Sequence, residues 1–325
     1  MAILMLVDDF GRLVKSMRIQ VNTTCNFHCF FCHMEGTEVN SSEMKATEIE
    51  RVVEIAAKWG VNRIKFTGGE PLMRRDIVEI VARVRKHISG DISLTTNGVL
   101  LVNKAAELKK AGLNRINISM HSIERDGFQF ITGVDALDRV EEGIKAARNA
   151  GLGPIKINFV VLKNINVHLI GRMIDFAAEN DAILQLIEYE TTKETEDSED
   201  YQRYHYSLEP IERKIAVQAL GEERNELHNR ERYTIRNRGK PVSIEFVKPM
   251  HNTDFCNNCT RIRLTSTGRL KPCLMRSDNL TDIIHEIRKE NRESSLDDIF
   301  RTAVKRREPY WRETDVIESE IFRKI

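Results

Sequence analysis

Short β-branched runs alternate with amphipathic helical stretches from about Ser16 to Ile187, and few folds are compatible with this pattern. Strands that alternate with helices at this spacing predict βαβ units and a parallel sheet. Six units are too few for a closed eight-stranded barrel but enough for a partial, open one, and a doubly wound sheet is the alternative. In both folds functional groups should lie at the carboxyl ends of the strands. The predicted strands are Met17–Val21, Arg63–Phe66, Ile92–Leu94, Arg115–Ser119, Ile155–Val161 and Ile183–Ile187.

The helical stretches between these strands have recognisable ends. Thr47 and Glu50 have the spacing of a capping box, and Gly60 marks the end of that helix. Asp76 is placed to open the next helix, and Gly90 to close it. These signals place a helix after each of the first two strands.

The regular pattern stops after Glu188. The stretch from Thr191 to Asp200 is rich in acidic residues and has no apolar period, so it predicts a solvated connection between two domains, residues 1–190 and 191–325. The polar segment Glu222–Lys240 contains several arginines and is predicted to form a solvated surface helix and loop.

Composition indicates an ordinary globular protein. The 325 residues are 41% hydrophobic and 30% charged, and a formal net charge of +1 gives no reason to expect nucleic acid or an anionic membrane as a partner. No apolar run approaches the roughly 20 residues that span a bilayer. The beginning of the chain lacks the basic region of a signal peptide, so the prediction is a cytoplasmic protein with reduced cysteines.

The six cysteines form two sets of three. Three thiolates are one ligand short of the four that a cubic iron–sulfur cluster or a tetrahedral zinc takes, so each site would keep a position open for a small molecule. The alternative is zinc, completed by His28 or His33 in the first set or by His251 in the second. The sets are Cys25, Cys29 and Cys32, directly after the first predicted strand, and Cys256, Cys259 and Cys273.

Two short motifs accompany the cysteines. Thr67-Gly-Gly-Glu-Pro follows the second predicted strand, where paired glycines let a ligand approach the backbone and Glu70 can accept from an ammonium group. Arg261 and Arg263 follow Cys259, and their planar guanidinium groups suit phosphate better than they suit a structural zinc site.

The first cysteine set and the GGEP motif together resemble the radical S-adenosylmethionine (SAM) superfamily. With the second set and the R-x-R that follows it, the chain resembles the GTP 3′,8-cyclase family, which catalyses the first step of molybdenum cofactor biosynthesis. The likeness extends from about Asp9 to Cys273 and includes the segments 65–76, 94–98, 117–119, 131–133 and 156–158. It implies an α/β fold, a partial six-stranded TIM-like barrel that a C-terminal auxiliary-cluster domain closes.

The resemblance also implies the chemistry. Members carry two 4Fe-4S clusters, and the first cluster cleaves SAM to a 5′-deoxyadenosyl radical. This radical removes hydrogen from C3′ of GTP, and C3′ then bonds to C8 to give (8S)-3′,8-cyclo-7,8-dihydroguanosine 5′-triphosphate. The second cluster holds the guanine. The implied partners are GTP, an electron donor protein or other reductant, the next enzyme of the pathway and a second copy of the chain, with no nucleic acid and no membrane.

Site residues follow from the positions that match the family. The implied SAM contacts are Phe31, Gly69, Glu70, Ser119 and Glu190. The implied GTP contacts are Arg18, Lys65, Thr95, Lys156, Arg261, Ile262 and Arg263. The implied metal ligands are Cys25, Cys29 and Cys32 for the first cluster, and Cys256, Cys259 and Cys273 for the second.

The chain departs from the family pattern at several positions. Phe31 stands where many members have tyrosine, Glu190 where many have methionine, and Gln185 where many have arginine. Members commonly end in a Gly-Gly tail, whereas this chain ends Phe322-Arg-Lys-Ile325. A radical SAM enzyme that modifies a peptide and a zinc-binding interaction module are the alternative functions.

Overall fold

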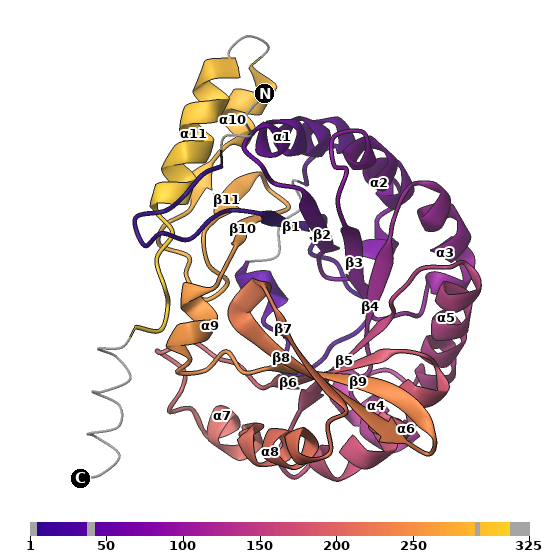
Figure 1. Cartoon of the computed structure of the whole chain (residues 1–325). Coiled ribbons are helices and arrows are strands. Elements are labelled where there is room, and N and C mark those ends of the chain that lie inside the picture. The colour runs from indigo at the N-terminus through magenta and orange to yellow at the C-terminus, as the bar shows by residue number, and fades with distance from the viewer. Residues whose placement is uncertain (1–4, 38–42, 290–292, 313–325) are drawn as a thin grey trace.

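The sheet contains six parallel strands in sequence order, as the alternating pattern predicts (Figure 1). The computed structural model describes residues 5–37, 43–289 and 293–312. The buried β-branched side chains of these strands, such as Ile64, Ile116 and Ile157, form the core beneath the surrounding helices. The strands are β1 (Ser16–Gln20), β2 (Arg63–Thr67), β3 (Ile92–Thr96), β4 (Arg115–Ser119), β5 (Lys156–Val161) and β6 (Ile183–Glu188).

The six strands curve into a partial barrel, and a layer of helices covers their outer face (Figure 1). The helices are α1 (Ala46–Lys58), α2 (Ile77–Arg85), α3 (Leu101–Lys110), α4 (Arg125–Thr132), α5 (Leu137–Asn149) and α6 (Ile170–Glu179). Short 3-10 turns lie at Met34–Gly36, Pro71–Met73, Val167–Leu169 and Leu227–Asn229.

The predicted start of α1 was wrong by a few residues. The helix begins at Ala46, and the side chain of Glu48, not Glu50, accepts from the backbone N–H of Lys45 at 2.8 Å. Thr47 therefore lies inside the helix instead of capping it. Gly60 follows α1 with a φ of +86°, a conformation that glycine adopts without strain, as its predicted role requires.

The C-terminal part of the chain adds one parallel strand to each edge of the six. β9 (Lys240–Val247) pairs with β6, and β10 (Arg261–Leu264) pairs with β1. β9 and β10 are not neighbours in the sheet, so the barrel stays open. The segment 248–260, which includes α9 (Thr253–Asn257), connects the two strands across the open side (Figure 1).

The segment Glu222–Lys240 is not a surface helix and loop, and this prediction was wrong. It forms most of β7 (Gly221–Asn225) and all of β8 (Arg230–Asn237), which extend the sheet as antiparallel strands beyond β9. This segment forms strands because apolar residues recur at every second position of β8, so that Tyr233 and Ile235 are buried on one face of the sheet.

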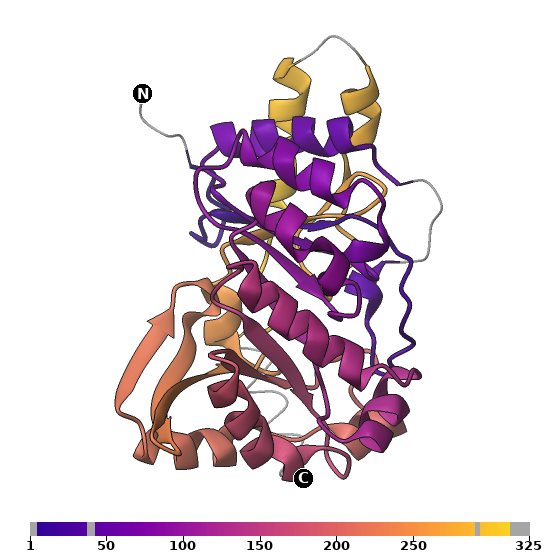
Figure 2. The ribbon, with the colours of Figure 1, turned by 90° about the vertical axis from the view of Figure 1, so that its right-hand side faces the viewer.

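The remaining elements flank the barrel. The acidic stretch after Glu190 lies mainly in turns and leads into α7 (Glu199–Tyr204) and α8 (Glu209–Val217). In Figure 2 the orange strands and the yellow C-terminal helices lie at opposite ends of the molecule. The last elements are β11 (Arg269–Lys271), β12 (Thr281–Asp282), α10 (Ile284–Arg288) and α11 (Glu293–Lys305).

α11 packs beside α1, where the indole N–H of Trp59 donates to Asp297 Oδ1 at 2.8 Å. Within the described ranges, no helix is long and apolar enough to cross a membrane.

Candidate active site

A cavity of about 730 Å³ fills the inside of the partial barrel. Residues from β1 to β6, from β8 and from the segment that crosses the open side line it. Strand register brings the predicted GTP contacts together, because Arg263 lies beside Arg18 and Arg18 beside Lys65. On the other side, Thr95 lies beside Asn117 and Asn117 beside Lys156. Side chains at paired positions point to the same face of a sheet, so all of them face the cavity.

The cavity reaches past the carboxyl ends of the strands. Ser119, the last residue of β4, and Cys32 in the loop after β1 line it at those ends, as expected from the fold. Lys156 and Arg261, however, are the first residues of β5 and β10 and lie toward the opposite end. The expectation that functional groups cluster at the carboxyl ends therefore covers only part of the site.

Arg18 and Arg263 share one buried carboxylate. Arg18 Nη1 lies 3.1 Å from Glu35 Oε1, and Arg263 contacts the other oxygen of the same group. Thr67 Oγ1 also donates to Glu35 at 2.9 Å. Burial alone would raise the pKa of Glu35, but the two arginines hold it below its ordinary value, so this carboxylate is ionised at neutral pH.

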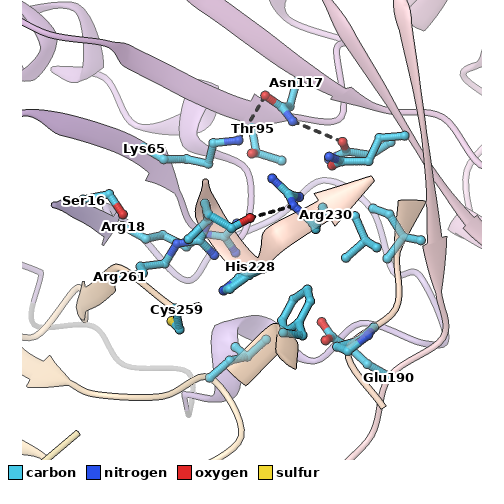
Figure 3. A pocket seen from close by; sticks show the side chains of 18 of the residues that line it. Ser16, Arg18, Lys65, Thr95, Asn117, Glu190, His228, Arg230, Cys259 and Arg261 are labelled. Atoms are coloured by element: carbon cyan, nitrogen blue, oxygen red, sulfur yellow. Dashed lines mark hydrogen bonds between the residues drawn. The ribbon is translucent and has the colours of Figure 1, made fainter. Parts of the chain in front are cut away.

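Lys65 and Arg261 lie in the same cavity and have no acidic partner in the part of the chain that the structure describes. Lys65 Nζ donates to Asn117 Oδ1 at 3.0 Å, and no carboxylate among the described residues lies within ion-pair distance of either cation. Loss of hydration and then the neighbouring arginines hold the pKa of Lys65 well below its ordinary value. Figure 3 shows Lys65, Arg18 and Arg261 pointing into one space, with Arg230 and His228 close by. Such a group of cations is a site for an anion with several charges.

The first cysteine loop lies at one wall of the cavity. Its backbone is fixed by hydrogen bonds from the N–H of His28 to Thr132 O at 2.9 Å and from Cys32 to Cys29 O at 3.0 Å. Loss of hydration, followed by the charges of Cys32 and Cys25, raises the pKa of Cys29 to about 12. A bound cation would favour the thiolate forms of these cysteines.

The GGEP motif is packed against this loop. The N–H of Gly69 donates to Asn22 O at 3.1 Å, and the N–H of Glu70 donates to Thr24 O at 2.8 Å. A Cβ atom at Gly69 would lie 2.3 Å from Thr24 O, so only glycine fits here. The carboxylate of Glu70 is buried and accepts from Thr96 Oγ1 and from the N–H of Asn97, each at 2.7 Å.

The second cysteine set lines the cavity from the open side. Cys256, Cys259 and Cys273 all face it, and none of the six cysteines forms a disulfide. Burial would raise the pKa of Cys259, but Arg307 and Arg261 hold it below its ordinary value. The N–H of Trp311 donates to Cys256 Sγ at 3.4 Å.

None of the six thiols is in a disulfide, and Cys32 and the three cysteines of the second set border one cavity, which suits the cluster ligands that the resemblance implies. The described residues contain no ready-made group of three side chains around a single metal ion. Of the histidines considered as zinc ligands, His251 contacts Glu196, and its ring centroid lies 4.1 Å from that of Trp311 at an interplanar angle of 36°. His33 Nε2 lies 3.7 Å from Glu190 Oε1.

Most of the predicted site residues border the cavity, and a few do not. The residues at its wall are Arg18, Phe31, Cys32, Lys65, Thr95, Ser119, Lys156, Glu190, Cys256, Cys259, Arg261, Arg263 and Cys273. Those outside its lining are Cys25, Cys29, Gly69, Glu70 and Ile262. Ile262 is fully buried in β10, so its side chain belongs to the core. The C-terminal end at Phe322–Ile325 lies outside the described residues.

Several residues of the site were missed from sequence. Glu35 and Glu245 each hold more than one cation, and Arg230 and Arg232 reach the cavity from β8. His121 also lines the cavity, its ring 5.0 Å from that of Phe31. The alternation of charged and apolar residues in β8 was the available signal, and it would have indicated a strand with one cationic face.

Two family models together match most of the chain. Residues 19–177 match the family model of the radical SAM superfamily, and residues 182–313 match that of Molybdenum Cofactor Synthesis C. A probable GTP 3′,8-cyclase of Thermoplasma volcanium is 57% identical, over 99% of this chain and 98% of that protein. One of Pyrococcus abyssi is 46% identical, over 94% of this chain and all of that protein.

A solved structure shares the fold. Streptococcus suis SuiB bound to its precursor peptide SuiA superposes with a TM-score of 0.64 over 94% of this chain and 68% of that chain. At 17% sequence identity this likeness concerns the fold alone.

Proposed function

This chain belongs to the GTP 3′,8-cyclase family of the radical SAM superfamily, and from this membership we propose how its own residues perform the reaction. The protein converts GTP to (8S)-3′,8-cyclo-7,8-dihydroguanosine 5′-triphosphate, the first step of molybdenum cofactor biosynthesis. The observation that best supports this function is the shared cavity. Cys32 and the three cysteines of the second set border it, as do Lys65 and Arg261, which have no acidic partner within the described ranges.

Two 4Fe-4S clusters and SAM supply the radical chemistry when they are bound. Cys25, Cys29 and Cys32 would hold the first cluster, in residues 1–190, and Cys256, Cys259 and Cys273 the second, in residues 191–325. The SAM contacts are Phe31, Gly69, Glu70, Ser119 and Glu190. Gly69 can serve through its backbone, because its tight packing against Thr24 fixes that backbone in place.

The chain itself contributes binding, orientation and exclusion of water. Arg18, Arg261 and Arg263 receive the phosphates, Lys65 faces them from the neighbouring strand β2, and Lys156 faces the same cavity from β5. Thr95 lies between these lysines and can bond to the ribose or the base. Phosphates held in this way keep the ribose beside the first cysteine loop, and positioning is the main role of the protein in such a reaction.

We also propose the cellular setting. The protein acts in the cytoplasm and receives electrons from a protein donor or other reductant. It passes its product to the next enzyme of the pathway and forms a homodimer. Nucleic acid and membranes are not among its partners.

One experiment tests this function directly. Protein purified without oxygen should be brown and hold about eight iron atoms, the content of two cubic clusters. With SAM, dithionite and GTP it should form 5′-deoxyadenosine and a product of the same mass as GTP. Cys25→Ala should form neither, because a three-ligand site cannot lose a thiolate. Colourless protein with bound zinc, or iron-loaded protein that leaves GTP unchanged, would contradict the proposal.

A further inference from the structure

We infer that Arg230, held in place by Glu245, is a further residue that binds the polyphosphate of the substrate, which presupposes the nucleotide proposed above. Arg230 lies at the start of β8, in the segment expected to be a solvated surface. Its side chain lines the cavity, and Figure 3 shows it directed toward the same space as His228 and Arg261. The family resemblance gives this arginine no role.

Glu245 is the centre of a buried charged network. Its side chain is fully buried on β9, and strand register places Gln185 on one side of it and Arg232 on the other. Arg230 Nη2 lies 2.8 Å from Glu245 Oε1, and Arg232 Nη2 lies 3.4 Å from Oε2. Lys156 contacts Oε2 as well, and Gln185 Nε2 donates to Oε1 at 3.0 Å. One carboxylate therefore orients three cations.

This arrangement fixes the direction of Arg230. Its Nε donates to Leu227 O at 3.3 Å and its Nη2 is held by Glu245, so both contacts restrain one edge of the guanidinium. Nη1 has no partner among the described residues, and only 12% of the side chain is exposed. A restrained arginine with a free donor at a cavity wall is suited to a ligand oxygen, because little side-chain entropy remains to be lost on binding.

The charge around Glu245 indicates an anion. Burial would raise the pKa of Glu245, but Arg230 and Lys156 hold it at about 2, so the carboxylate is ionised and offsets only one of the three cations. Glu35 similarly offsets one of its two arginines. Lys65 and Arg261 add two more cations to the same cavity. The cavity thus contains two groups of cations, one paired with Glu35 and one with Glu245. Two such groups suit a ligand with several phosphates better than a ligand with a single negative charge.

A purely structural network makes a different prediction. If Arg230 only supported the fold, its loss would lower stability and leave the binding of nucleotides unchanged. If Arg230 binds phosphate, its loss should weaken the binding of GTP more than the binding of GMP, because GMP lacks the phosphates that Arg230 would contact.

The test compares Arg230→Met with Arg236→Met in the iron-loaded enzyme. Arg236 lies on the same face of β8, six positions further along, and is exposed and outside the cavity. For Arg230→Met we expect the KM for GTP to rise about ten- to a hundredfold, the usual loss for a hydrogen bond to a charged group, with the affinity for SAM unchanged. The preference for GTP over GMP should shrink. Arg236→Met should match the wild-type protein in both respects.

A second variant tests the positioning role. Glu245→Gln keeps all the cations but removes the charge that orients them, so the KM for GTP should rise while that for SAM does not. If Glu245→Gln does not fold, Arg230→Met still decides the question. An Arg230→Met enzyme with an unchanged KM for GTP and only a lower melting temperature would overturn the inference. A wild-type enzyme that cannot cyclise GTP would overturn the proposed function instead.

Discussion

At the scale of single residues, the distinctive feature of the site is a group of cations that outnumber the carboxylates paired with them. Arg18 and Arg263 have Glu35, and Lys156, Arg230 and Arg232 have Glu245, but among the residues that the structure describes Lys65 contacts only an asparagine. A half-buried cation without a counter-ion destabilises the folded chain. The absence of a counter-ion among the described residues is consistent with the proposed role of Lys65 in binding the phosphates of GTP.

Replacement of Lys65 by methionine should separate binding from stability. At pH 7 we expect Lys65→Met to bind GTP at least tenfold more weakly, while its free energy of unfolding is unchanged or higher by about 1 kcal/mol. The folded-state pKa of Lys65 is lowered, so the wild-type protein gains stability as pH rises from that value toward the ordinary lysine pKa of about 10.4. Lys65→Met should lack this gain.

Denaturant unfolding at several pH values, beside GTP titrations, measures both effects. The exposed residue Lys110 gives the control, because Lys110→Met should change neither quantity by more than about 0.5 kcal/mol. A clear loss of stability in Lys65→Met, with GTP affinity intact, would show that Lys65 has a structural role only.

At the scale of elements, loops without regular structure determine where the first cysteine set lies. The GGEP turn after β2 bonds to the backbone that precedes Cys25. Its two glycines allow this approach, since a Cβ at Gly68 would lie 2.1 Å from Asn22 Oδ1. The motif therefore serves packing as well as any contact with a ligand.

Gly69→Ala should disturb this packing. The new Cβ would meet the backbone of Thr24, which cannot rotate away, so we expect a loss of about 1–3 kcal/mol in the free energy of unfolding and weaker SAM binding. Gly171→Ala is the matched control, because nothing lies within 4 Å of its Cβ position in α6 and alanine favours a helix. Equal stability of the two variants would mean that the GGEP loop adapts easily.

The sequence predicts those features of the structure that depend on residues close together in the chain. The six parallel strands and the cysteine loop could be predicted, because hydrophobic period and motif spacing are local. The roles of Glu35 and Glu245 could not, since each carboxylate meets its cations across strands that are distant in sequence. β8 is intermediate: its period of two was present, but its many arginines favoured a solvated surface.

At the scale of the whole molecule, the barrel depends on strands from both parts of the chain. β10 covers the edge of β1, and β9 covers the edge of β6. An uncovered strand edge pairs readily with another molecule. The region with the first cysteine set therefore needs the C-terminal region for its edges as well as for the second set.

A fragment of residues 1–190 should be unable to remain monomeric. With β1 and β6 unpaired, we expect aggregation or higher oligomers in size-exclusion chromatography. Co-expression with residues 191–325 should restore a soluble complex of the two pieces. A monodisperse monomer of the fragment alone would show that the two edges are protected in some other way.

The pairing of β1 with β10 also affects how the chain is synthesised. Ser16 bonds to Thr260, a partner 244 residues later in sequence. At ribosomal rates of about 5–20 residues per second, β1 emerges roughly 12–50 seconds before the strand that covers its edge. Throughout that interval the growing polypeptide exposes an open strand edge, so a chaperone that shields it should increase the yield of folded protein.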